Sequence, residues 1–159
     1  MINTFSFGGG HKESEKDGKK VFIPVPPPIV LQNGGAIIPI MVSHPKSVAE
    51  QLQKEGKNIP VIQCNALIDT GAFGSVITPK VADALNLVQT GFQEVTSVNN
   101  QEKQPAYFAR LQFNWGKAKD VQVVSCPLKG NFDVLIGRDI LIHWNFTYNG
   151  KDGYIVICD

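Results

Sequence analysis

The chain lacks several features that would assign it to a common functional class. Its 159 residues include only three cysteines and three histidines, and their positions do not have the spacing of a metal site. An odd cysteine number also argues against a disulfide framework, so we expect buried or free thiols at Cys64, Cys126 and Cys158. The sequence therefore predicts no metal and no other cofactor.

An excess of either charge is also missing, since 15 basic and 14 acidic residues leave a net charge of +1. No basic stripe indicates a nucleic-acid partner, and no basic amphipathic helix indicates a membrane surface. The longest apolar runs are too short to span a bilayer, and the first residues lack a charged region followed by an apolar core. We expect a cytoplasmic protein with neither a nucleic-acid nor a membrane partner.

The most informative segment that is present is Asp69-Thr70-Gly71-Ala72, which follows the apolar run 66–68. It places an acidic residue at the end of a buried strand. A given triplet of this kind occurs by chance in about 3 of 100 chains of this length. The plain alternative is a strand that ends in a turn, with Asp69 and Thr70 bonding their own backbone and Gly71 at positive φ.

A second segment, Leu135-Ile136-Gly137-Arg138-Asp139, repeats the pattern of an apolar strand that runs into a glycine. Together the two segments resemble the retropepsin-like aspartic proteases, the single-domain family typified by retroviral proteases. In that family a hydrophobic pair precedes Asp-Thr/Ser-Gly-Ala/Ser, a flap hairpin follows, and a second hydrophobic pair leads into Gly and commonly Arg-Asn/Asp. The resemblance covers roughly residues 35–157.

The expected fold class is all-β: a retropepsin-like closed barrel or sandwich of short strands with a flap hairpin and one to three short helices. One helix is expected over 45–55, and another is expected to begin at Pro79, with Thr78 as its cap and Val81, Ala84 and Leu85 buried. The strands are expected at 36–42, 59–68, 95–98, 106–113, 121–126, 134–136 and 154–157.

Composition divides the chain into three parts. Residues 1–20 are expected to be a mobile, charged, glycine-rich tail, because they contain too little apolar surface to offset the entropy of ordering. Residues 21–34 are expected to be a proline-rich extended lead-in, with a proline-motif ligand as the other reading. A turn signal at 33–35 then opens the retropepsin-like domain, residues 35–159.

The resemblance implies an aspartic endopeptidase that acts on polypeptide substrates as a homodimer, because the chain has only one Asp-Thr-Gly. Asp69 from each subunit would contribute to a pair of carboxyl groups that share a proton, one activating water and the other polarising the scissile carbonyl. Thr70 would bond to the partner's backbone beneath the pair. Gly71 would allow a close backbone turn and leave its N–H free to meet a carboxylate.

Substrate contacts are expected from Ala72 and from a flap over residues 94–102. Because Ala72 lacks the hydroxyl that Ser would offer to the carboxylate, the pair should keep its shared proton to higher pH, and activity should lie nearer neutrality. In the flap, Ser97, Val98 and Asn99 are expected to meet the substrate. The flap sequence lacks the glycines usual in the family, so a plain exposed hairpin stays open.

Arg138 and the activity itself each allow more than one interpretation. Arg138 matches the family arginine by position, and its partner could be Asp139 or a residue of the second subunit, or it could be a surface residue at a helix start. The whole chain could be a catalytically inactive or very weak retropepsin-fold module for dimerisation or peptide binding. A β-barrel with a fortuitous motif is the third interpretation of the chain.

Overall fold

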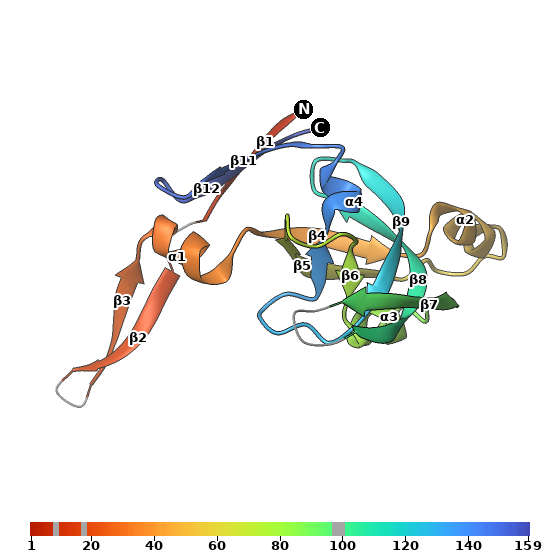
Figure 1. Cartoon of the computed structure of the whole chain (residues 1–159), viewed down its shortest axis with the longest axis horizontal. Coiled ribbons are helices and arrows are strands. Elements are labelled where there is room, and N and C mark those ends of the chain that lie inside the picture. The colour runs from red at the N-terminus through yellow and green to blue at the C-terminus, as the bar shows by residue number, and fades with distance from the viewer. Residues whose placement is uncertain (8–9, 17–18, 97–100) are drawn as a thin grey trace. The chain divides into compact units, whose positions relative to one another are not determined.

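The structure is a computed structural model that describes residues 1–7, 10–16, 19–96 and 101–159. These residues form two compact units (Figure 1). One unit comprises residues 37–142, and the other combines residues 1–36 with residues 143–159. The two apolar motifs of the sequence both fall in the unit 37–142, which we call the barrel unit; we call the other the terminal unit.

A closed β-sheet forms the barrel unit. Its strand order is β4-β5-β10-β6-β9-β8-β7, and an additional pairing of β4 with β8 closes the sheet, which leaves β7 attached to β8 as a hairpin. This architecture confirms the expected all-β class. The strands are β4 (Ile37–Ser43), β5 (Val61–Ile68), β6 (Val76–Ile77), β7 (Gln89–Thr96), β8 (Gln101–Phe113), β9 (Ala118–Ser125) and β10 (Val134–Ile136).

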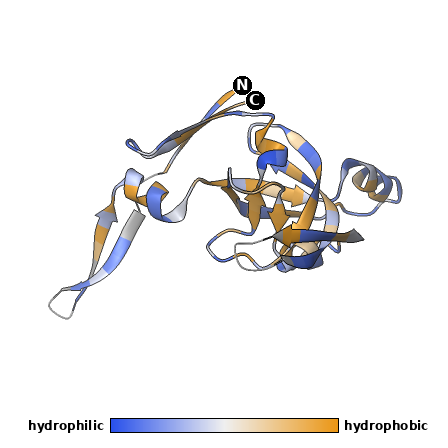
Figure 2. Ribbon diagram, viewed as in Figure 1, coloured by the Kyte–Doolittle hydropathy of each residue, from blue (hydrophilic) through white to orange (hydrophobic). Residues whose placement is uncertain are grey.

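Alternating hydrophobicity explains why these segments close around a core. In β4, Ile38, Ile40 and Val42 are buried, while the intervening Pro39 and Met41 are exposed. The long strand β8 pairs with three other strands. Its first residues pair with β7, its later residues pair with β9, and its last residues also pair with β4, which closes the barrel. Figure 2 shows the resulting concentration of hydrophobic residues on the barrel strands.

Three short helices accompany the barrel: α2 (Lys46–Lys54), α3 (Pro79–Ala84) and α4 (Arg138–Leu141). The helix expected over 45–55 is confirmed as α2, which has no buried residue and projects from the barrel in Figure 1. For α3 the expected start at Pro79 is confirmed. Two details were wrong: the Thr78 side chain makes no capping hydrogen bond, and Ala84 is exposed while Ala82 is buried.

The terminal unit contains a three-stranded sheet, a hairpin and a helix. The sheet has the order β1-β12-β11, from β1 (Ile2–Ser6), β11 (Asn145–Asn149) and β12 (Tyr154–Cys158). The hairpin pairs β2 (Gly10–Lys16) with β3 (Lys19–Val25), and the helix is α1 (Pro27–Gly34). In the sheet, Ile155 and Ile157 of β12 are fully buried.

This unit differs from the sequence expectation in its secondary structure. Residues 2–6 and 10–16 are strands, although composition indicated a segment without regular structure, because pairing with β12 and β3 supplies hydrogen bonds that composition does not reveal. The stretch after β3 is helical rather than extended. Its prolines occupy the N-cap and first turn of α1, where no backbone N–H is needed.

The glycines at the end of α1 also have a different role from the expected one. Gly35 has φ 77° and its N–H donates to Leu31 O, so the turn that precedes β4 is the C-cap of a helix. The division of the chain into a tail (residues 1–20), a lead-in (21–34) and a protease domain (35–159) remains a prediction. No helix in the described part of the chain is long and apolar enough to cross a membrane.

Candidate active site

The two apolar motifs lie side by side in the sheet. Strand β10 pairs with β5 in parallel, and the register sets Leu135 opposite Leu67 and Ile136 opposite Ile68. The residues that pair between the two strands are buried or half-buried, as those of parallel strands usually are. Residues that follow the two strands therefore emerge at the same edge of the sheet, which brings Asp69 and Gly137 into one region.

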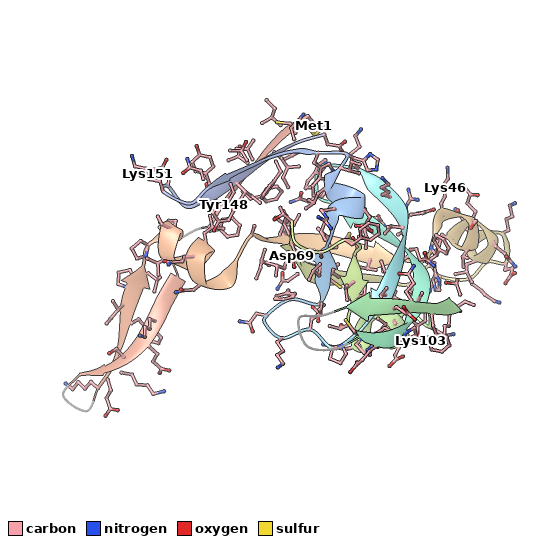
Figure 3. All side chains as sticks on the ribbon, in the orientation of Figure 1. Met1, Lys46, Asp69, Lys103, Tyr148 and Lys151 are labelled. Carbon is pink, nitrogen blue, oxygen red and sulfur yellow. The ribbon has the colours of Figure 1, made fainter. Side chains whose placement is uncertain are left out.

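Asp69 is the first residue after β5 and is half-buried. Its backbone N–H donates to Ile136 O at 3.0 Å, so the parallel pairing continues to the acid itself. Its Oδ1 accepts a hydrogen bond from Gly71 N at 2.8 Å, which fixes the carboxyl group over the turn. Figure 3 labels Asp69 on the barrel unit. The arrangement presents an acidic group of defined orientation at the sheet edge.

The rest of the turn is exposed but tied to the start of α4. Thr70 and Gly71 are exposed, Ala72 is half-buried, and the Phe73 side chain is 84% exposed. The carbonyl of Ala72 accepts Arg138 N at 3.0 Å, and the carbonyl of Phe73 accepts an N–H from the same helix. Two backbone hydrogen bonds therefore hold the turn from below.

The backbone conformation of Gly71 differs from the one that a plain turn predicted. Gly71 is not among the described residues with positive φ, so the plain-turn reading was wrong on that point. A Cβ at this position would lie 3.1 Å from Asp69 Oδ1, so a larger residue would press on the carboxyl group. The bond from Gly71 N–H to the Asp69 carboxylate is consistent with both the turn reading and the protease reading.

Gly137 marks the tightest backbone approach in the site. An added Cβ on Gly137 would lie 2.5 Å from both the carbonyl carbon and the carbonyl oxygen of Gly74. The chain from Asp69 to β6 thus passes directly over the end of β10. No side chain fits between the two segments, which explains the glycine that ends the second apolar motif.

Sequence reasoning missed the polar pair beneath the turn, Ser75 and Asp139. Ser75 is 1% exposed, and its N–H and hydroxyl donate to the two oxygens of the Asp139 carboxylate at 3.0 and 2.9 Å. The Ser75 hydroxyl oxygen also accepts Gly137 N at 3.2 Å. No spacing rule marks this pair, although a serine directly before the apolar β6 is a weak sign of a buried polar contact.

The contacts of Asp139 with Ser75 also show whether Asp139 is the partner of Arg138. Asp139 directs its carboxylate to Ser75, and the described residues provide no ion pair between Asp139 and Arg138. Asp139 as the partner of Arg138 was therefore wrong. Arg138 is exposed at the start of α4, which agrees with a surface residue; a contact with a second subunit stays a prediction.

The expected flap corresponds to the hairpin of β7 and β8. These strands pair antiparallel from Gln89 opposite Tyr107 up to Thr96 opposite Gln101. The expected substrate contacts Ser97, Val98 and Asn99 lie outside the described residues, between the two strands.

Two of the three cysteines, Cys64 and Cys126, do not offer an alternative nucleophile. Burial, with a smaller effect of the Asp133 carboxylate, raises the pKa of the Cys64 thiol to about 11, while Lys80 opposes the shift. Burial also raises the pKa of Cys126. Both groups are therefore neutral thiols near pH 7, which disfavours thiolate chemistry. The described residues contain no group of three potential metal ligands.

Comparison with known proteins identifies the family. The family model described as gag-polyprotein putative aspartyl protease matches residues 58–143. No curated protein sequence matches the chain. Among solved structures, EIAV protease complexed with the inhibitor HBY-793 is similar at 20% identity, TM-score 0.44, over 51% of this chain and 76% of that chain.

Two further structures are similar at lower identity. A retropepsin-like aspartic protease from Rickettsia conorii has 14% identity and a TM-score of 0.45, covering 77% of this chain and 91% of that chain. Simian foamy virus (mac) protease has 11% identity and a TM-score of 0.41, covering 66% and 92%. The family assignment comes from the family model, which matches more than half of the chain. The chain therefore belongs to the gag-polyprotein putative aspartyl protease family, and so to the retropepsin-like aspartic proteases.

Proposed function

We propose that the protein is an aspartic endopeptidase that hydrolyses polypeptides as a homodimer. The observation that carries this proposal is the position of Asp69. Its carboxyl group stands on a turn with an exposed side, fixed by Gly71 N–H and by the parallel pairing of β5 with β10. Family membership supports the same chemistry.

In the proposed reaction, Asp69 of each of two copies contributes one carboxyl group. Two such groups held close together share a single proton, since both cannot ionise at short range. The ionised group takes a proton from water, and the resulting nucleophile attacks the scissile carbonyl, which the protonated group polarises. The C–N bond of the tetrahedral intermediate then breaks, and the leaving nitrogen receives the proton that the carboxyl group took from water. Thr70 is proposed to bond to the partner's backbone, and Gly71 to hold the carboxylate, as it does in the single chain.

The substrate is proposed to lie between this turn and the β7–β8 hairpin. Ala72 would contact the peptide from the turn, and Ser97, Val98 and Asn99 would contact it from the hairpin. Closure of such a hairpin excludes water from the reacting groups and holds the peptide in place. The proposal needs no metal or cofactor.

Dimer dependence provides the test of this proposal. Because each chain has one Asp-Thr-Gly, specific activity should fall on dilution through the dimer dissociation constant. Peptide hydrolysis measured over a dilution series, beside sedimentation velocity at the same concentrations, checks this. The two curves should have the same midpoint, and a statine-type transition-state mimic should inhibit at every concentration. Undiminished specific activity in a protein that sediments as a monomer would contradict the proposal.

Residue 72 provides a second test, of the pH dependence. In Ala72→Ser a hydroxyl would be able to donate to the ionised Asp69 carboxylate, so the pair would give up its shared proton at lower pH. We expect the profile of kcat/KM against pH to move toward acid, compared with the wild-type protein on the same peptide. An unchanged profile, or one displaced toward alkaline pH, would mean that residue 72 does not face the carboxyl groups.

A peptide-binding module without turnover is the second candidate, and one sequence observation favours it. The segment 97–100, between the two hairpin strands, contains no glycine. Such a module would bind a peptide and a statine-type mimic with comparable affinity and release the peptide intact. An endopeptidase binds the transition-state mimic more tightly, since catalysis requires differential binding.

A further inference from the structure

The contact between Ser75 and Asp139 is a buried hydrogen-bond cluster and not a contact on the surface. The Ser75 side chain is almost fully buried, and both of its donors end on one carboxylate. The same carboxylate also accepts Ile140 N at 3.0 Å through Oδ1. Three donors on one carboxylate form a charge-assisted cluster, which is stronger than separate neutral hydrogen bonds.

The cluster lies at the point where the Asp69 turn rejoins the sheet. At its start the turn is fixed by Asp69 N–H on Ile136 O, and in its middle by Arg138 N–H on Ala72 O. Its end is fixed by Ser75, whose hydroxyl also meets Gly137 N–H. Since the intervening Thr70 and Gly71 are exposed, the turn depends on these ties and on the hydrogen bond from Asp139 N–H to Phe73 O.

We propose that Asp139 and Ser75 are positioning residues that set the placement of the Asp69 carboxyl group. The inference rests on the proposed function. Asp139 accepts hydrogen bonds from both the N–H and the hydroxyl of Ser75, and it thereby holds the end of the turn against β10 and α4. Loss of this support lets the turn shift, and a displacement of about 1 Å costs on the order of a hundredfold in rate where reacting groups must align.

The central variant is Asp139→Ala, measured in the full chain by steady-state peptide hydrolysis. We expect kcat to fall between about tenfold and a hundredfold with little change in KM, because the alignment of Asp69 changes while the substrate contacts remain. The limbs of the pH profile should keep their positions, since Asp139 itself does not exchange a proton with the substrate.

Two further variants separate positioning from charge. In Asp139→Asn the amide oxygen is able to accept Ser75 N–H, and the amide NH₂ is able to donate to the Ser75 hydroxyl, so most of the wild-type kcat should return. Ser75→Ala removes the hydroxyl contacts with Asp139 and with Gly137 N–H but keeps the bond from Ser75 N–H to Asp139, so the end of the turn stays attached and kcat should fall less than in Asp139→Ala. The double variant Ser75→Ala with Asp139→Ala should lose less than the sum of the two single losses, because the two residues share one contact.

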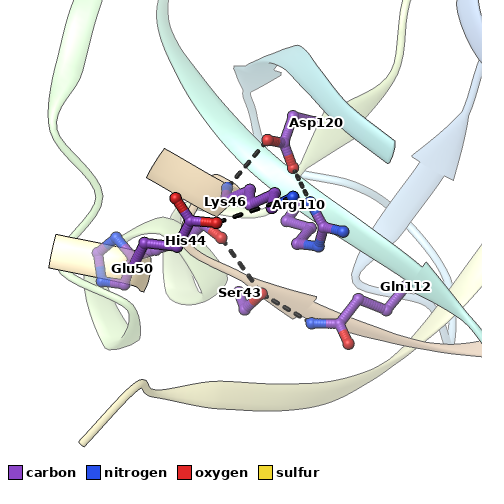
Figure 4. Close-up of polar contacts among 7 residues, drawn as sticks. All are labelled: Ser43, His44, Lys46, Glu50, Arg110, Gln112 and Asp120. Atoms are coloured by element: carbon purple, nitrogen blue, oxygen red, sulfur yellow. Dashed lines mark hydrogen bonds and ion pairs between the residues drawn. The ribbon is translucent and has the colours of Figure 1, made fainter. Parts of the chain in front are cut away.

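Asp120 offers a matched control in the same unit. Its carboxylate also accepts one backbone N–H, from Lys46 at 2.9 Å, and one side-chain donor, from Arg110 at 2.7 Å (Figure 4). These contacts join β9 to β8 and to the start of α2, not to the Asp69 turn. Asp120→Ala should therefore leave kcat unchanged.

Amide hydrogen exchange gives a readout that needs no activity. In Asp139→Ala the amide protons of Ser75 and Gly137 should exchange faster, while those of β4 and β9 keep their wild-type rates. Unchanged kcat, or unchanged exchange at Ser75, in folded Asp139→Ala would overturn the inference, as would an equal loss of kcat in Asp120→Ala. A wild-type chain that cleaves no peptide would refute the proposed function, and exchange at Ser75 would still decide whether Asp139 holds the turn.

Discussion

Asp69→Asn should abolish peptide hydrolysis while leaving the fold intact. An amide can neither take a proton from water nor share one with a second carboxyl group, so we expect kcat to fall by at least about a thousandfold. The fold should persist, because the amide oxygen of Asn is able to accept Gly71 N–H as the carboxylate does, and residue 69 is only half-buried. Hydrolysis of one peptide and the circular dichroism of both proteins are the measurements.

Asp83→Asn serves as the control for the loss of one negative charge from the barrel unit. Asp83 lies exposed on α3, and its replacement should leave both rate and fold unchanged. Normal turnover in folded Asp69→Asn would remove the enzymatic assignment from this site. A loss of rate in both variants would point to net charge and not to the chemistry of Asp69.

Gly137→Ala should produce the largest loss of stability among single methyl additions in the site. The added Cβ would lie 2.5 Å from the Gly74 carbonyl carbon and oxygen, which are backbone atoms and cannot rotate away. Overpacking typically costs 1–3 kcal/mol, so a clash with backbone should lower the free energy of unfolding of the barrel unit by about 3 kcal/mol or more.

Gly74→Ala is the matched control, because it adds the same methyl group to the other side of the same contact. An added Cβ on Gly74 meets no described atom within 4 Å, and Gly74 is not among the described positive-φ glycines. Its free energy of unfolding should therefore stay within about 1 kcal/mol of the wild-type value. Equal destabilisation by the two variants would mean that the segments do not approach as described.

The unfolding experiment should isolate the barrel unit. The chain has two tryptophans, and Trp115 lies in the barrel unit, stacked on Phe113 with ring centroids 4.9 Å apart. A Trp144→Phe background leaves Trp115 as the sole tryptophan. Its fluorescence in urea then gives the transition for the wild-type barrel and for both glycine variants.

Much of the barrel could be predicted from the sequence, because alternation and short apolar runs carry the signal for each strand. The two motifs could be recognised as parts of one pattern, because each is an apolar strand with a characteristic ending. The first strand ends in Asp69-Thr70-Gly71, and the second ends in Gly137. Their parallel register is a tertiary property, however, and only the structure sets Leu67 beside Leu135.

Two of the remaining differences have a common physical cause, which is contact between distant segments. Strand β1 has little hydrophobic pattern of its own and exists through hydrogen bonds to β12. The Ser75–Asp139 contact likewise joins residues far apart in the chain, and neither residue type announces a partner. The C-cap at Gly35 has a local cause instead, because Asn-Gly-Gly suits both a turn that opens a strand and the end of a helix.

The parallel pairing of β5 with β10 also has a consequence for folding kinetics. Asp69 is synthesised long before β10, so its turn has no support until residues 134–139 close a large loop against β5. Contacts of such high sequence separation form slowly, because the entropy of loop closure is spent before the contacts stabilise anything. A nascent or partly folded chain would then carry the acidic residue without its geometry, and the proposed activity would require that β10 has already paired with β5.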